Sequence, residues 1–174
     1  SPDKSMSVML IDAWEEYLQY PDLRPRVIEE ATSIYGDANE FGHGKKVDLI
    51  VIEDKSAGIS LIQDLQRAGL PIRSYNPGNA DKMQRLNIVA PIIAKGRVYI
   101  PESMKNEGMA RDWAETVISQ LCSFPEVRHD DLVDSTTQAL RILRDSGHIN
   151  IDPVYDPHDS YDEDRPMRVN PYAV

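Results

Sequence analysis

Short apolar runs that alternate with amphipathic segments constrain the fold of this chain most. The clearest run covers residues 47–53, VDLIVIE, which has the length of a buried strand and ends in an acid. By the same criteria we predict strands over residues 8–14, 47–53, 71–75 and 97–100, and helices over residues 22–35, 59–68, 80–94, 109–121 and from about 130 through Leu143. This alternation is typical of an α/β fold whose sheet is at least partly parallel.

Length and charge limit the organisation and the partners. With 174 residues the chain can build one sizeable core, and we predict one domain over residues 1–150 and an acidic, irregular tail over residues 151–174. The net charge of −10 argues against a general nucleic-acid binder, so any DNA contact must come from local basic clusters or another domain. No apolar run has the length of a membrane span and no signal peptide is evident, which predicts an intracellular protein. The single cysteine, Cys122, lies in an apolar run, and we predict a buried, unreactive thiol.

Three acids gather where the last predicted helix begins, in the stretch SFPEVRHDDLVD of residues 123–134. Asp130 is a natural N-cap, while Asp131 and Asp134 are three residues apart and share a face. Negative charge at a helix start is favourable by about 0.3–1 kcal/mol, so a purely structural role is open. Clustered carboxylates also repel one another, and Mg²⁺ or Mn²⁺ would remove that cost through hard oxygen ligands.

A fourth acid, Glu53, ends the most apolar strand. Functional groups gather at the carboxyl ends of strands in open α/β sheets, although a strand-end charge can simply reach water. If Glu53 meets the acids of residues 130–134, the pocket could hold two metal ions against a phosphodiester. His129 is then either an assisting group or a polar neighbour. Lys82 and Arg85 share a helix face, which is either a solvated basic face or, if it lies beside the acids, a set of phosphate contacts.

Several of these motifs, in this order and spacing, carry a family resemblance. They are VIEDKSAG at residues 51–58, Asp81-Lys82 with Arg85, GRVYIP at residues 96–101, Phe124-Pro125, and HDDLVD at residues 129–134. Between about Met9 and Leu143 the chain resembles the C-terminal nuclease domain of the large terminase subunit of tailed bacteriophages and prophages.

The resemblance implies a ribonuclease-H-like fold, a mixed sheet flanked by helices, related to Holliday-junction resolvases. It implies a Mg²⁺- or Mn²⁺-dependent endonuclease, with two metal ions in the full domain, that cuts concatemeric viral DNA during genome packaging. The implied partners are double-stranded DNA, an N-terminal ATPase domain, the small terminase subunit and the portal protein, in the cytoplasm of an infected or lysogenic bacterium and without a membrane. The family's second acid falls on Glu53, its C-terminal acid falls on the pair Asp130 and Asp131, where Asp131 is favoured, and Asp134 matches a further acid.

One departure from the family pattern concerns the first metal-binding Asp, which the family carries on its first strand. Here the first predicted strand, residues 8–14, resembles the family's third, and Asp12 aligns better with a structural strand residue than with the missing acid. We therefore expect this chain to lack the first strands, the first catalytic Asp and the ATPase domain, and to bind metal weakly and cut poorly or not at all.

Two other functions are compatible with the residues. A non-catalytic fragment of a packing motor would dock on portal or DNA and use the acids as caps and solvated charges. A Holliday-junction-resolvase-like nuclease would prefer four-way junctions to linear duplex. A rise in melting temperature with Mn²⁺ would distinguish a metal site from the docking module, because an ion that binds only the folded state stabilises it.

Overall fold

The computed structural model describes residues 6–35, 44–55 and 57–149. In chain order its elements are β1 (Val8–Met9), α1 (Tyr20–Thr32), β2 (Ile50–Glu53), α2 (Ala57–Arg67), β3 (Ile72–Tyr75), α3 (Lys82–Ala94), β4 (Val98–Tyr99), α4 (Asp112–Ser123) and α5 (Asp131–Asp145). The predicted α/β class is confirmed, and the five predicted helices are present. The predicted tail, residues 151–174, lies outside the described residues.

The strands pair in parallel, as the alternation with helices predicted. β1 pairs with β4 and β2 pairs with β3, with Glu53 opposite Tyr75 at the carboxyl end of the second pair. We expected one mixed sheet, but in the described ranges the strands form two separate two-stranded sheets. The predicted strand over residues 8–14 is regular only at Val8–Met9, because its pairing with β4 ends there.

The first residues of two helices can be compared with the sequence-based predictions. α1 begins at Tyr20 rather than at Asp22, with extended backbone at Gln19 and a proline, Pro21, in the first turn. α3 begins as its sequence indicates: the Asp81 side chain accepts from the Gln84 backbone N–H, and the Gln84 side chain accepts from the Asp81 N–H. This reciprocal cap fixes where α3 begins and therefore positions Lys82, its first residue.

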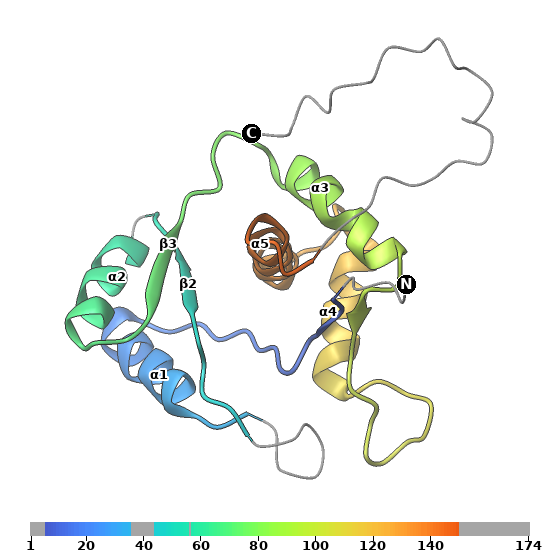
Figure 1. Ribbon diagram of the computed structural model, residues 1–174, viewed down its shortest axis with the longest axis horizontal. Helices are drawn as coiled ribbons and strands as arrows, with labels where there is room; N and C mark the ends of the chain where they lie inside the picture. Colours follow the sequence, from blue (N-terminus) through green and yellow to red (C-terminus); the bar gives the residue numbers. More distant parts are fainter. Residues whose placement is uncertain (1–5, 36–43, 56, 150–174) are drawn as a thin grey trace.

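Helix α5 lies at the centre of the molecule, with α3 and α4 on one side and the β2–β3 pair with α1 and α2 on the other (Figure 1). The main core forms where α3 and α5 pack together. It consists of Val89, Ile92, Leu140 and Ile149, with Val8, Leu86, Ile88, Val98 and Leu143 packed around them. The start of α3 is thereby brought to the start of α5, so residues far apart in the sequence become neighbours.

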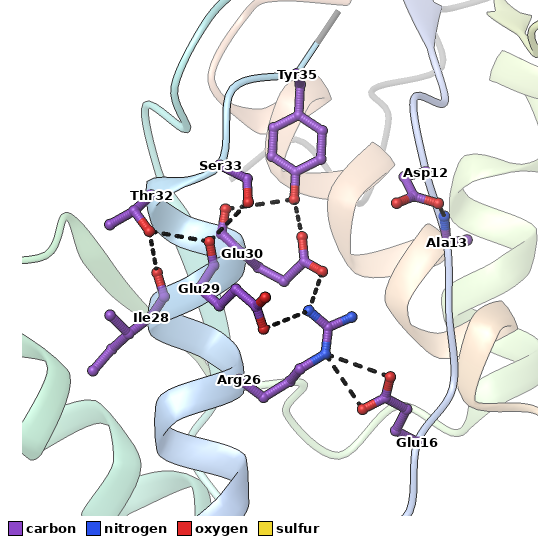
Figure 2. Close-up of polar contacts among 10 residues, drawn as sticks. All are labelled: Asp12, Ala13, Glu16, Arg26, Ile28, Glu29, Glu30, Thr32, Ser33 and Tyr35. Atoms are coloured by element: carbon purple, nitrogen blue, oxygen red, sulfur yellow. Dashed lines mark hydrogen bonds and ion pairs between the residues drawn. The ribbon is translucent and has the colours of Figure 1, made fainter.

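The extended segment of residues 10–19 is held against α1 by one arginine. The Arg26 guanidinium lies 4.2 Å from the centre of the Trp14 ring, and its Nε is 3.3 Å from a Glu16 carboxylate oxygen. Figure 2 shows the same guanidinium paired with Glu30, which also accepts a hydrogen bond from the Tyr35 hydroxyl. Burial and the bond to Glu30 raise the pKa of Tyr35 to about 12. This network positions the segment whose residues 14–18 line the pocket described below.

The fold shows the surroundings of Cys122 and of Gly58. Cys122 is exposed on α4, so the prediction of a buried thiol is wrong, because α4 buries Ala114, Val117 and Gln120 instead. Gly58 serves close packing: a Cβ at this position would lie 2.1 Å from the Glu53 carbonyl oxygen.

None of the helices in the part of the chain that the structure describes is long and apolar enough to cross a membrane.

Candidate functional site: acids at the ends of β2 and α5

Glu53 lies at the carboxyl end of β2, where the sequence placed it. Its side chain is partly buried, and one carboxylate oxygen is 2.8 Å from the Lys55 ammonium nitrogen, just beyond the strand. The first turn of α2 presses against the Glu53 carbonyl at Gly58. The position of Glu53 is therefore set by strand pairing on one side and by the start of α2 on the other.

The acids Asp130 and Asp134 share one cation from α3. The Lys82 ammonium nitrogen is 2.7 Å from an oxygen of Asp130 and 2.7 Å from an oxygen of Asp134. Burial opposes the charge of this lysine, but the hydrogen bonds to the two carboxylates outweigh it and raise the pKa of Lys82. Asp130 occupies the N-cap position of α5 as predicted, but its side chain makes no cap hydrogen bond and accepts from Lys82 instead.

Arg85 holds Asp134 from the buried side. Its guanidinium donates to an Asp134 oxygen at 2.8 Å and to the Ala80 carbonyl at 2.9 Å, and its side chain is only 7% exposed. Its Nε is buried and has no hydrogen-bond partner in the described ranges. Two cations therefore contact Asp134: Arg85 pairs with one carboxylate oxygen from the buried side, and Lys82 pairs with the other from the more exposed side.

Asp131 contacts a different neighbourhood although it is only three residues from Asp134. It lines a pocket of about 610 Å³ whose walls come from the extended segment and the start of α5. The lining residues are Trp14, Glu15, Glu16, Tyr17, Leu18, His129, Asp131, Leu132 and Ser135. The expected shared face is thus divided: Asp134 faces α3 and Asp131 faces the pocket.

A buried glutamine, Gln120, connects two residues that line the pocket, and no local sequence pattern indicates this role. The Gln120 side chain on α4 donates to Glu15 at 3.0 Å and accepts from the Leu132 backbone N–H at 3.2 Å. It satisfies one of the free N–H groups of the first turn of α5, a task usually left to the N-cap side chain. Both partners are distant in sequence, so only the fold reveals this role.

The carboxylates suit a hard cation, but the structure does not gather them around one point. Across residues 6–35, 44–55 and 57–149, no group of three or more His, Cys, Asp or Glu side chains is placed so that it could hold a metal ion. The predicted convergence of Glu53 with Asp131 and Asp134 is thus not seen in these ranges. The donor chemistry nevertheless fits, since carboxylate oxygens are the ligands that Mg²⁺ and Mn²⁺ prefer. Metal binding by this set stays a prediction.

The fold and the position of the acids define a class: an α/β domain with carboxylates at the end of a strand and at the start of a late helix. Comparison with protein families gives the family itself, because the model of the terminase RNaseH-like domain matches residues 28–142. The chain belongs to this terminase RNase H-like family, and the resemblance read from the motifs is confirmed. Searches of curated proteins and of solved structures returned no match.

The matched region contains every acid singled out from the sequence except Asp12. Asp12 lies on the extended segment, outside the strand, and accepts a hydrogen bond from the Ala13 N–H. The roles of Glu53 and the α5 acids, and the assisting role of His129, stay predictions.

Proposed function

We propose that this chain is the metal-dependent endonuclease domain of a phage or prophage terminase large subunit, which cuts concatemeric viral DNA during genome packaging. The observation that carries the proposal is the family match over residues 28–142, because that stretch contains both acid-bearing segments. The class of reaction is hydrolysis of a phosphodiester in double-stranded DNA.

The carboxylates supply the ligands in this proposal. Glu53, Asp131 and Asp134 would bind Mg²⁺ or Mn²⁺, and Asp130 is the further catalytic acid. Ions held by these residues would supply activation of a water molecule and stabilisation of the charge on the leaving oxygen. The protein holds the acids at fixed places: strand pairing orients Glu53, and the buried Arg85 orients Asp134.

The basic residues at the start of α3 supply the DNA contacts. The Lys82 side chain is 40% exposed, so its ammonium can reach a phosphate near the acids. Arg85 is buried against Asp134, and its proposed contribution to DNA binding therefore requires that pairing to open. Because the chain carries a net charge of −10, this local basic site matters more than the overall field.

A terminase domain implies a DNA-packaging complex. The partners that we propose are the N-terminal ATPase domain, the small terminase subunit and the portal protein. The place of action that we propose is the cytoplasm of the infected or lysogenic bacterial host.

Nicking of a supercoiled plasmid tests the proposal. Wild-type protein, Glu53→Gln and Asp131→Asn would be incubated with plasmid and Mn²⁺, with EDTA as the blank. Two exposed acids provide matched controls: Glu107→Gln in the loop before α4, and Asp48→Asn ahead of β2. The expected result is Mn²⁺-dependent nicking that is weak at best in this chain and stronger in a longer terminase chain that includes the ATPase domain. Both controls should keep it, and Glu53→Gln and Asp131→Asn should lose it by at least tenfold.

Two results would count against the proposal. Nicking that persists unchanged in both site variants would show that these acids are not the ligands. Absence of nicking in a longer terminase chain that includes the ATPase domain would remove the endonuclease assignment.

A second function, the non-catalytic docking module, is favoured by one observation. Asp130 and Asp134 are already neutralised by Lys82 and Arg85, as acids with a purely structural role would be. The docking module predicts no change in melting temperature with Mn²⁺, whereas a metal site raises it as the ion concentration passes the dissociation constant.

A further inference from the structure

A dense set of charges lies between the starts of α3 and α5. There the Lys82 ammonium is 2.7 Å from Asp130 and 2.7 Å from Asp134. A cation seated between two carboxylates occupies the place and performs the charge neutralisation that a divalent ion would otherwise provide. The lysine is built into the protein, so it is present at every concentration of metal.

The surroundings of this lysine differ on its two sides. Toward the interior, Arg85 is 6% exposed, bonds Asp134 and leaves its own Nε buried without a partner in the described ranges. Toward solvent, the Lys82 side chain is 40% exposed on a flexible stem. Arg85 is therefore held more firmly than Lys82, which can leave the carboxylates without disturbing the core.

From this geometry we propose that Lys82 is an internal competitor that occupies the Asp130–Asp134 pair until a divalent cation displaces it. The inference rests on the proposed metal-dependent function and adds a regulatory residue to the same site. Loading of the ion and release of the lysine are then one event, and the released ammonium becomes free to bind a DNA phosphate. Reciprocity requires that a phosphate that draws Lys82 away also tightens the binding of the ion.

The test is calorimetric titration of Mn²⁺ into the wild type, Lys82→Met and Lys82→Gln. Lys82→Met keeps the apolar stem, so it guards against a packing defect, and the melting temperature of each variant without metal verifies folding. Lys105→Gln, in the loop between β4 and α4, removes the same charge from an exposed position and is the matched control. Asp134→Asn identifies binding that depends on the acid pair.

The competitor predicts that Lys82→Met and Lys82→Gln bind Mn²⁺ about tenfold more tightly than the wild type and Lys105→Gln. Tenfold corresponds to about 1.4 kcal/mol, which is reasonable for an ammonium partly exposed between two carboxylates. Equal affinity in the wild type and the Lys82 variants, with binding abolished in Asp134→Asn, would overturn the competitor and leave the proposed metal site intact. Absence of Mn²⁺ binding in every variant would overturn both.

A second measurement requires no variant. Crystals of the wild-type protein soaked in Mn²⁺ should show the Lys82 nitrogen moved away from at least one of the two carboxylates. An ion bound at Asp134 while Lys82 keeps both contacts at 2.7 Å would contradict displacement.

Discussion

Replacement of Gly58 by alanine tests the contact that positions Glu53. An ideal Cβ at residue 58 would lie 2.1 Å from the Glu53 carbonyl oxygen, whereas ordinary contact begins near 3.4 Å. The obstructing atom belongs to the backbone, so it cannot rotate away as a side chain would. The first turn of α2 and the end of β2 must therefore separate by about 1 Å or more.

The magnitude follows from two opposing terms. Overpacking of this kind costs about 1–3 kcal/mol, while alanine is a better helix former than glycine by up to about 1 kcal/mol. Because the obstructing atom is backbone, the overpacking cost should lie near its upper end, about 2–3 kcal/mol, which leaves a net loss of about 1–2 kcal/mol. For a chain of this size that lowers the melting temperature by about 2–8 °C. Because the displaced group is the Glu53 backbone, the proposed Mn²⁺-dependent nicking should fall as well.

The assay is thermal unfolding monitored by circular dichroism, with plasmid nicking on the same samples. Ser60→Ala is the matched control, because it lies exposed on the same helix and also introduces alanine. Its melting temperature should equal or slightly exceed that of the wild type. A Gly58→Ala protein as stable as the wild type would refute the close approach of α2 to β2.

Three further outcomes are expected. Gln120→Leu leaves the buried Leu132 N–H without its acceptor and should cost about 1–3 kcal/mol in urea unfolding; unchanged stability would contradict that role. Ile92→Ala empties a fully buried core position and should cost about 2–5 kcal/mol in the same assay, so a loss below 1 kcal/mol would place the core elsewhere. The pKa of Tyr35 is raised from 10.0 to about 12, so the protonated hydroxyl stabilises the folded state. This contribution is complete below pH 10 and is lost as the pH rises to 12. The stability advantage of the wild type over Tyr35→Phe, whose ring cannot bond Glu30, should shrink over that interval; a constant difference would refute it.

Local patterns predicted the elements of this fold better than their partners. The run that ends at Glu53 and the start of α3 are determined by residues within a few positions, so the end of β2 was predicted at the right residue and the start of α3 within about two residues. The predicted strand nevertheless began at residue 47, whereas β2 begins at Ile50. The strand predicted over residues 8–14 failed, because its apolar composition cannot specify how far pairing with β4 extends. The α/β class needed only the order of the elements, whereas the two separate strand pairs depend on tertiary geometry.

At the candidate site the residue types could be predicted but not the contacts. Asp130 is a residue type that favours the N-cap position, yet its side chain accepts a hydrogen bond from a lysine 48 residues away because α3 packs on α5. Phosphate contact by Lys82 is predicted only if its helix lies beside the acids, and the structure places the starts of α3 and α5 together. Gln120 could not be found from sequence, since its two partners come from other elements.

Anomalous diffraction from crystals soaked in Mn²⁺ tests the central proposal most directly, because it locates the ion itself. The proposal predicts anomalous peaks in contact with the carboxylates of Glu53 and of Asp131 or Asp134. Carboxylates that stay free of manganese at saturating concentration, or peaks confined to other acids, would contradict it.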